Sequence, residues 1–300
     1  LGQGISNAVG MAIAEKVLAS KFNTEDYKIL DHMTYVFAGD GCLMEGISHE
    51  ACSLAGTLGL GNLIVFYDDN DISIDGNVEG WFTEDIPRRF ESYGWDVIPN
   101  IDGHNFNEID KALEKAKLNK NKPTLICCKT VIGSGSPNMA GTAAAHGAIV
   151  DSEEIALIRN SLNWDREPFD IPEEVYANWD AREAGKLKEQ SWNKILDEYA
   201  NKNPELSAEF KRLIAGDLPD DIEQSIYSFI DDVQMELPKI ATRVSSQKVL
   251  NVLGPLVPEL LGGSADLTGS NNTNWDGTKE IRINDFSGNY INYGVREFGM

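Results

Sequence analysis

Short apolar runs alternate with stretches of helical periodicity through the first half of the chain. The apolar runs have the length of buried strands and lie at residues 34–38, 62–67, 95–98 and 123–131. Apolar positions repeat at helical spacing over residues 6–22 and 45–58, and again at Ile109, Leu113 and Ala116. Strands that alternate with helices predict an α/β domain whose parallel sheet is flanked by helices.

Two polar residues, thirty positions apart, each follow one of these strand-like runs. Asp40 lies between Gly39 and Gly41 after the first run, and Asn70 comes soon after the second. A strand–helix–strand unit of this length favours parallel neighbours whose carboxyl ends lie at one edge of the sheet, where open α/β sheets bind ligands. Both side chains offer oxygen, and glycine lets a bulky anion approach. The pattern therefore predicts a divalent cation that holds a diphosphate.

Beyond residue 150 the pattern changes to highly charged helices. Residues 152–164 and 173–200 are typical of such helices, and the LPDD segment at 218–221 marks a break. A second apolar-periodic unit starts near Ile240 and reaches a strand-like run at 260–264. We therefore expect the start of a second α/β domain that is incomplete at residue 300.

Composition argues against several classes of function. The 300 residues include 26 Lys and Arg against 48 Asp and Glu, a net charge of −22. Such a chain repels phosphodiester backbones and anionic lipid surfaces, so we expect neither nucleic acid nor a membrane as a partner. No apolar run approaches the roughly 20 residues that a spanning helix needs.

The start of the chain and its cysteines predict a fragment from a reducing compartment. The first residues, LGQG, show no signal-peptide pattern and no initiator Met, so we expect a piece of a longer protein. The four cysteines have no C-x-x-C spacing. Cys127 and Cys128 lie in an apolar run, and we expect them to be small buried residues of a strand.

Seven sequence strings, in order from end to end of the chain, resemble transketolase. Gly39, Asp40 and Gly41, followed by Asn70, are similar to the GDG…N motif of thiamine-diphosphate enzymes. The seven strings are LGQGISNAVGMA at 1–12, GDGCLMEGIS at 39–48, DDNDISIDG at 68–76, HGA at 146–148, ATR at 241–243, GGSADLT at 262–268 and YGVRE at 293–297. Ordered matches of this number are far more specific than one GDG.

The resemblance implies a role for each matching position. Asp40, Asn70 and the main-chain carbonyl of Ile72 would bind Mg²⁺ or Ca²⁺, since a hard cation prefers oxygen ligands. The residues that would contact thiamine diphosphate are Leu1, Gly41, Asn70, His146 and Glu297. Glu297 and His146 would be the catalytic residues, with Glu297 hydrogen-bonded to the aminopyrimidine ring of the cofactor. Substrate would be bound by His146, Arg243 and Ser270, the last two at the sugar phosphate.

For the whole enzyme, the resemblance implies transfer of a two-carbon ketol unit from a ketose phosphate to an aldose phosphate. The enzyme would be a cytoplasmic homodimer of the pentose phosphate pathway, with each active site shared between subunits. We expect residues 1–218 to form the diphosphate domain without its N-terminal segment, 219–235 a linker, and 236–300 the first part of the pyrimidine domain. The truncated chain alone is expected to be inactive.

One departure from the family pattern affects the substrate loop. Members of the family often have a further histidine three residues before His146, where this chain has Ala143. The threonine and alanines at 142–145 offer no charged or imidazole side chain, so the sequence does not define which residues of that loop contact substrate. His146 itself is retained.

Other interpretations make different demands on the sequence. A nucleotide-binding module would need G-x-G-x-x-G or G-x-x-x-x-G-K-[ST], and an EF-hand starting at Asp71 would need Glu where Phe82 stands. A 2-oxo-acid decarboxylating enzyme would share the cation motif but would not need Arg243 and Ser270. A non-catalytic transketolase-like scaffold would not need Glu297. Cofactor titration and donor assays distinguish these classes.

Overall fold

The computed structural model describes residues 1–147 and 149–300. Its contacts divide the chain into two compact units. The first comprises Leu1–Val9, Met33–Gly56 and Leu60–Lys194, and the second comprises Gly10–His32, Thr57–Gly59 and Ile195–Met300. None of the described helices has the length and apolar character that crossing a lipid bilayer requires.

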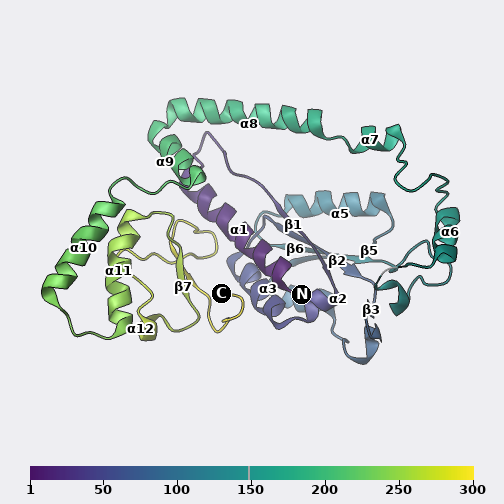
Figure 1. Cartoon of the computed structure of the whole chain (residues 1–300), viewed down its shortest axis with the longest axis horizontal. Coiled ribbons are helices and arrows are strands. Elements are labelled where there is room, and N and C mark those ends of the chain that lie inside the picture. Colours follow the sequence, from purple (N-terminus) through teal and green to yellow (C-terminus); the bar gives the residue numbers. More distant parts are fainter. Residues whose placement is uncertain (148) are drawn as a thin grey trace. The chain divides into compact units, whose positions relative to one another are not determined.

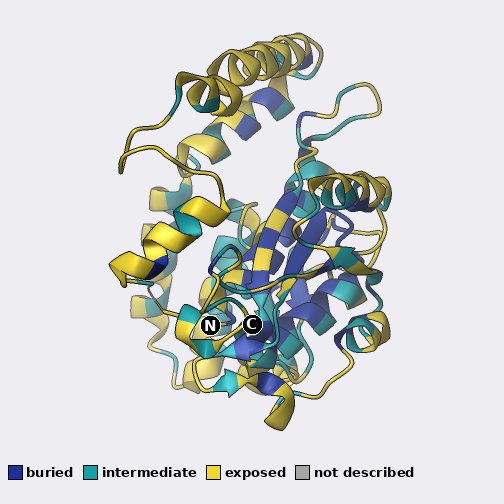
Figure 2. Cartoon of the chain, turned by 90° about the vertical axis from the view of Figure 1, so that its right-hand side faces the viewer, coloured by how far each residue is buried: buried dark blue, intermediate teal, exposed yellow. Residues whose placement is uncertain are grey.

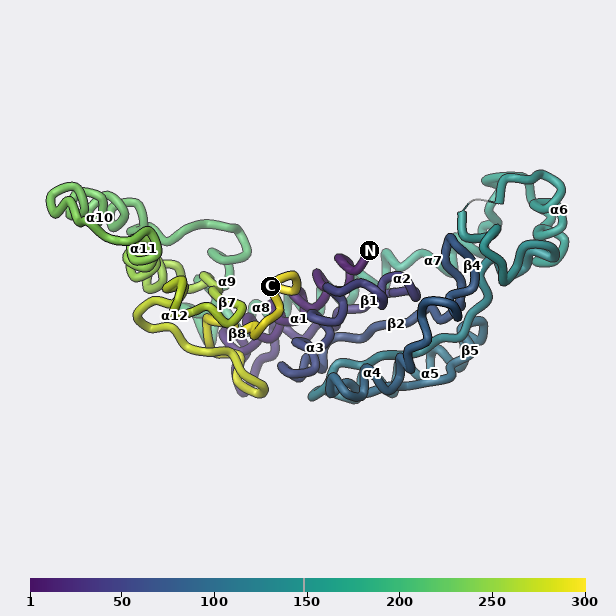
Figure 3. The backbone as a smooth tube through the Cα atoms, turned by 90° about the horizontal axis from the view of Figure 1, so that it is seen from below, coloured from purple at the N-terminus to yellow at the C-terminus, as the bar shows by residue number. Residues whose placement is uncertain are grey.

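A four-stranded parallel sheet forms the centre of the first unit, as the alternating pattern predicted. Its strands are β1 (Thr34–Gly39), β2 (Leu63–Asp69), β5 (Asp96–Asp102) and β6 (Thr124–Lys129). The order is β1-β2-β6-β5, and β1 and β2 run side by side (Figure 3). The register pairs Gly39 with Asp68, so the segments that follow both strands leave the same edge of the sheet.

The central strand β2 is apolar because it is buried within the sheet. Residues 63–67 of β2 are all buried, and Figure 2 shows dark blue strands beside one strand that alternates between buried and exposed residues. Helix α5 (Phe106–Leu118) lies along the strands (Figure 1). The buried residues of their shared core are Ile64, Phe66, Ile98, Ala112, Ala116, Ile126 and Cys128. Ile109 and Leu113 pack against this core, which confirms the helix predicted from their spacing.

The two neighbouring cysteines of β6 are buried, which confirms the sequence-based expectation. Cys127 is 5% and Cys128 is 7% exposed, and both are free thiols. Burial raises the pKa of Cys127 to about 12 and that of Cys128 to about 11. These thiols are neutral at physiological pH and serve as small apolar residues of the core.

The first strand leads directly into a helix. Helix α2 (Asp40–Met44) begins at Asp40, and α3 (Gly46–Leu58) follows after Glu45. The sequence predicted a helix only from about residue 45, so it missed the helical turn that starts at Asp40. Asp40 is the first residue of this helix, a position at which the helix dipole favours a carboxylate.

The segment after β2 forms a small hairpin and a short helix. The hairpin pairs β3 (Ile72–Ser73) with β4 (Gly76–Asn77), and a 3₁₀ turn follows at Val78–Gly80. Helix α4 (Ile86–Ser92) begins where the Asp85 side chain accepts a hydrogen bond from the backbone N–H of Arg88. This capping bond fixes the first turn of α4.

Close packing at Gly56 gives a testable stability prediction. A Cβ at Gly56 in α3 would lie 1.8 Å from the carbonyl oxygen of Tyr93, which is fixed backbone. We expect Gly56→Ala to destabilise the fold by about 1–3 kcal/mol or more. Gly10→Ala is the matched control, because a Cβ there meets nothing within 4 Å. It should stabilise by about 0.5–1 kcal/mol. Urea unfolding of both variants tests the prediction, and equal midpoints would contradict it.

Four further elements complete the charged middle of the chain. They are the 3₁₀ turn Ala143–Ala145, α6 (Ser152–Ser161), α7 (Glu173–Trp179) and α8 (Arg182–Lys202). The expectation of one continuous helix over 173–200 is wrong, since the helix breaks at Asp180. Asp180 Oδ1 accepts hydrogen bonds from the backbone N–H of Arg182 at 3.1 Å and from its Nε at 2.8 Å. Asp180 is the C-cap of α7, and its bonds to Arg182 fix the turn that leads into α8.

The second unit has its own aromatic core. Helix α1 (Gln3–Phe22) starts three residues earlier than predicted, and α9 (Pro204–Ala215) follows α8. Phe22, Ile29, Tyr199 and Phe210 form the buried cluster, in which the rings of Phe22 and Phe210 meet edge to face at 5.3 Å. The Tyr199 hydroxyl donates to the carbonyl oxygen of Phe22 at 2.8 Å, so the polar end of this fully buried ring is satisfied.

A charged pair on this unit predicts loss of stability in acid. Glu209 accepts hydrogen bonds from Arg212 and from Lys21, and these bonds lower its pKa to about 2. Its contribution is present above the unfolded pKa of about 4.5 and is lost as pH falls towards 2. Because Glu209 is 28% exposed, we expect only about 1 kcal/mol.

The matching measurement is urea unfolding between pH 2 and pH 6. Glu209→Gln should be less stable than the parent at pH 6 and should converge with it near pH 2. Glu205→Gln, an exposed neighbour on the same helix, is the control and should follow the parent throughout. Parallel curves for the parent and Glu209→Gln would refute the prediction.

The C-terminal part of the second unit contains helices and a two-stranded sheet. Helices α10 (Ile222–Glu236) and α11 (Thr242–Leu256) lie side by side (Figure 1 and Figure 3). Strand β7 (Gly262–Ser264) pairs in parallel with β8 (Tyr290–Asn292), and α12 (Thr268–Asn271) lies between them in sequence. Residues 219–235, expected as a linker, lie largely in α10. The domain boundaries stay a prediction.

Candidate cofactor and metal site

The predicted cation residues meet at the carboxyl end of the sheet. Asp40 directly follows β1, and Asn70 directly follows β2, its parallel neighbour. Both residues line one cavity of about 930 Å³. The structure therefore brings together in this cavity six of the residues selected from the sequence: Leu1, Asp40, Gly41, Asn70, Ile72 and His146.

Asp40 is buried, and its two oxygens have different surroundings. The residue is 4% exposed. Oδ1 accepts a hydrogen bond from the Tyr67 hydroxyl, whereas Oδ2 has no hydrogen-bond partner among the described residues. Burial raises the pKa of Asp40, and the hydrogen bond from Tyr67 opposes that effect. An unsatisfied buried carboxylate oxygen is unfavourable, and a cation would satisfy it.

Asn70 is held in a tight turn that exposes oxygen atoms. Its Oδ1 accepts from the backbone N–H of Ile72 at 3.0 Å, and its Nδ2 donates to Asp68 Oδ2 at 3.2 Å. Between them, Asp71 adopts the left-handed conformation with φ of 60°. The carboxamide oxygen retains a second lone pair, which is available to a cation.

These donors fit a hard divalent cation. A carboxylate, a carboxamide and a main-chain carbonyl are all oxygen ligands, which suit Mg²⁺ or Ca²⁺ completed by diphosphate oxygens. In the described part of the chain, no three His, Cys, Asp or Glu side chains are grouped to hold a metal ion by themselves. The available ligands are mixed oxygen donors, which suit Mg²⁺ or Ca²⁺ better than a structural zinc.

The remaining predicted cofactor residues form the rim of this cavity. Gly41 lies beside Leu1, since a Cβ at Gly41 would be 3.1 Å from Leu1 Cδ1. His146 is exposed and follows the 3₁₀ turn Ala143–Ala145, where its backbone N–H donates to Ala143. The third residue of its motif, Ala148, lies outside the described residues. Exposed residues at a cavity mouth are available to a ligand.

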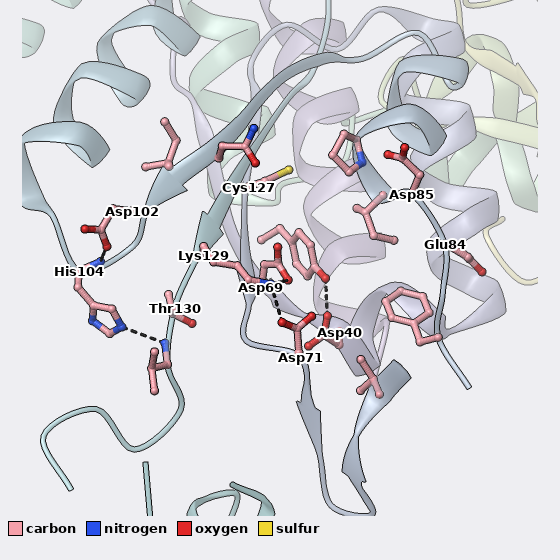
Figure 4. A pocket seen from close by; sticks show the side chains of 18 residues that line it. Asp40, Asp69, Asp71, Glu84, Asp85, Asp102, His104, Cys127, Lys129 and Thr130 are labelled. Carbon is pink, nitrogen blue, oxygen red and sulfur yellow. Dashed lines mark hydrogen bonds and ion pairs between the residues drawn. The ribbon is translucent and has the colours of Figure 1, made fainter. Parts of the chain in front are cut away.

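A second cavity, of about 720 Å³, is also lined by Asp40 (Figure 4). Lys129 lies in it and forms ion pairs with Asp69 at 3.1 Å and Asp71 at 2.6 Å. On the other side, His104 Nε2 accepts from the backbone N–H of Val131 at 2.9 Å. This hydrogen bond ties the loop after β5 to the end of β6, so it supports the edge of the sheet at which Asp40 lies.

The predicted substrate and catalytic residues of the second unit are all exposed. Arg243 lies in the first turn of α11, Ser270 in α12, and Glu297 in the segment after β8. Burial and hydrogen bonding do not distinguish these three from ordinary surface residues. Their assignments rest on the resemblance and stay predictions.

Sequence reasoning missed the polar residues that support the site. Tyr67 belongs to an apolar run and was counted only as part of a strand, although its hydroxyl contacts Asp40. Thr130, whose hydroxyl donates to Asp68, was likewise overlooked. Their positions in the sequence could have identified them, because both residues lie at or just beyond the carboxyl end of a parallel strand, where α/β sheets bind ligands.

The fold is that of an α/β protein with a cavity lined by oxygen donors at the carboxyl edge of its parallel sheet. Residues 1–219 match the family model described as transketolase, thiamine diphosphate binding domain. Residues 238–300 match the model described as transketolase, pyrimidine binding domain. The chain belongs to the transketolase family.

Several relatives and solved structures agree with this assignment. The chain is 59% identical over 300 residues to transketolase 2 of Vibrio parahaemolyticus, and 57% identical to transketolase 1 of Vibrio cholerae. These matches cover 100% of the chain but 45% of each relative. The crystal structure of a Pichia stipitis transketolase in complex with sedoheptulose-7-phosphate is similar, with a TM-score of 0.92 and 43% identity, over 100% of this chain and 45% of that one. A Leishmania mexicana transketolase gives 0.91 and 40%, over 100% and 44%.

Proposed function

We propose that the protein containing this chain is a transketolase that uses thiamine diphosphate. It transfers a two-carbon ketol unit from a ketose phosphate to an aldose phosphate. The observation that carries the proposal is the cavity at the sheet edge, in which Asp40, Asn70 and Ile72 meet with Leu1, Gly41 and His146. The chain spans less than half the length of the curated relatives that it matches, so the proposed activity is that of the whole protein.

In this proposal, the residues of the first unit hold the diphosphate end of the cofactor. Asp40, Asn70 and the carbonyl of Ile72 bind Mg²⁺ or Ca²⁺, and the cation holds the diphosphate. Gly41 and Leu1 form a wall beside it, and His146 lies at the mouth of the cavity. When bound, thiamine diphosphate supplies the nucleophilic carbon that breaks and remakes the carbon–carbon bond, while the protein supplies position and electrostatics.

Residues of the second unit have the substrate and proton-transfer roles. Arg243 and Ser270 grip the phosphate of the sugar, for which a planar guanidinium is well suited. Glu297 would hydrogen-bond the aminopyrimidine ring of the cofactor and so orient that ring for proton transfer. Support for sugar-phosphate substrates comes from the Pichia stipitis enzyme, whose crystal structures include a complex with sedoheptulose-7-phosphate and, for a mutant, one with fructose-6-phosphate.

The quaternary and cellular setting completes the proposal. We propose a cytoplasmic homodimer of the pentose phosphate pathway, in which each active site is shared between subunits. The diphosphate domain comprises residues 1–218 and the pyrimidine domain starts at 236, with 219–235 between them. The separate family-model matches to residues 1–219 and 238–300 support this division.

Two measurements test the proposed function. Isothermal titration of thiamine diphosphate with and without Mg²⁺ shows whether the protein binds the cofactor through a cation. Assays on the full-length protein containing this chain then compare ketose phosphates with 2-oxo acids as donors. Turnover of ketose phosphates alone supports a transketolase, whereas turnover of 2-oxo acids alone would favour the decarboxylating class.

A further inference from the structure

The side chain of Tyr67 is placed to orient the Asp40 carboxylate. Tyr67 lies in β2 opposite Ala38 of β1, two residues before Asp40, and is 4% exposed. Its hydroxyl donates to Asp40 Oδ1, and the dashed line that ends on Asp40 in Figure 4 marks this bond. A buried aromatic ring in a central strand has little freedom, so the hydroxyl is a fixed point.

The hydrogen bond gives the two oxygens of the Asp40 carboxylate different surroundings. Oδ1 is satisfied by the Tyr67 hydroxyl, whereas Oδ2 is buried without a partner among the described residues. A carboxylate with both oxygens unpaired could rotate about its Cβ–Cγ bond. With Oδ1 fixed, Oδ2 is fixed as well. The structure thus presents a single oriented oxygen donor.

The charges near Asp40 favour a divalent cation at that donor. Asp69 and Asp71 place negative charge near Asp40, and the positive charge of Lys129 opposes their effect. Lys129 already forms ion pairs with both aspartates, at 3.1 Å and 2.6 Å. Tyr67 is neutral, so it orients Asp40 without removing the negative charge that attracts a cation.

We infer that Tyr67 is a positioning residue for the cation that holds the cofactor. This inference rests on the proposed function, because it assigns Tyr67 a role at the same cation site. A group that hydrogen-bonds a metal ligand typically contributes about 10–100-fold to metal affinity. The Tyr67 hydroxyl makes such a hydrogen bond to Asp40 Oδ1. Tyr67 has no contact with substrate in this role and acts only through Asp40.

The test uses Tyr67→Phe, which removes the hydroxyl and keeps the ring. MgCl₂ or CaCl₂ is titrated calorimetrically into the full-length protein containing this chain, in the presence of saturating thiamine diphosphate. We expect Mg²⁺ affinity to fall about 10-fold or more. Ca²⁺ affinity should fall less, because Mg²⁺ demands near-ideal octahedral geometry whereas Ca²⁺ accepts flexible coordination.

A second tyrosine provides the matched control. Tyr199 is also fully buried and donates its hydroxyl to the carbonyl oxygen of Phe22, so Tyr199→Phe loses a comparable bond away from the cation residues. Its metal affinities should equal those of the parent. If Tyr67→Phe keeps parental Mg²⁺ affinity, or loses Mg²⁺ and Ca²⁺ equally along with its thermal stability, the positioning role is refuted.

Asp40→Ala separates this inference from the proposed function. If the parent binds Mg²⁺, Asp40→Ala loses it and Tyr67→Phe does not, then only the role of Tyr67 is wrong. If Asp40→Ala binds Mg²⁺ like the parent, the cation site itself is elsewhere, and both proposals fail together.

Discussion

Replacing Asp40 with alanine is expected to abolish Mg²⁺-dependent binding of thiamine diphosphate. Asp40 supplies the buried carboxylate oxygen that has no partner among the described residues. Loss of a residue that hydrogen-bonds a metal ligand typically lowers metal affinity about 10–100-fold. Loss of the charged ligand itself should therefore lower metal affinity by more than about 100-fold. Isothermal titration of the cofactor, with Mg²⁺ and again with EDTA, measures the effect directly.

The control for Asp40→Ala removes the same charge elsewhere in the first unit. Asp110 is an exposed residue of α5, and Asp110→Ala should bind the cofactor as the parent does. Asn70→Ala should give an intermediate loss, because it removes a neutral ligand and the hydrogen bond to the backbone of Ile72. Cofactor affinity that depends on Mg²⁺ to the same extent in Asp40→Ala and the parent would contradict the assignment.

The geometry of this site was predictable because it follows from the order of strands and helices. Once two apolar runs flank a helix, right-handed parallel crossover makes them neighbours, and the residues after them meet at one edge. The register of Gly39 with Asp68 realises that expectation. Asp40 and Asn70 therefore could be paired from the sequence without any knowledge of the rest of the fold.

The support of the site was less predictable because it depends on side-chain direction within buried strands. Tyr67 stands in a run whose residues are all buried, so neither periodicity nor polarity separates it from its neighbours. The helical start at Asp40 was missed for a related reason, because glycines on both sides favour a loop in a local reading. The break at Asp180 was missed because an Asp within a highly charged segment also fits an exposed helix surface.

Residues of the second unit illustrate a different limit. Arg243, Ser270 and Glu297 are exposed, and their structure in this chain does not select them over other polar surface residues. Only the flanking strings ATR, GGSADLT and YGVRE identify them, through resemblance to the family. Their roles depend on a bound cofactor and substrate, so functional measurements provide the decisive test.

Glu297→Ala is expected to separate cofactor binding from turnover. The proposed role of Glu297 is to hydrogen-bond the aminopyrimidine ring and favour the tautomer that removes a proton. In the proposed function, Asp40, Asn70 and Ile72 hold the diphosphate end of the cofactor through a cation, so the affinity for thiamine diphosphate should stay within a few-fold of the parent. Positioned proton transfer contributes roughly 10²–10⁴-fold to rate, and we expect kcat to fall by an amount in that range.

The experiment compares two carboxylates in the full-length protein containing this chain. Cofactor affinity is measured by isothermal titration, and kcat with a ketose phosphate donor and an aldose phosphate acceptor. Asp276→Asn, which changes an exposed carboxylate of the same unit, should leave both quantities unchanged. A Glu297→Ala protein with near-parental kcat would remove Glu297 from proton transfer. A group that acts only after binding lowers kcat without a loss of cofactor affinity when it is removed. A Glu297→Ala protein that fails to bind the cofactor would therefore make Glu297 a binding residue instead.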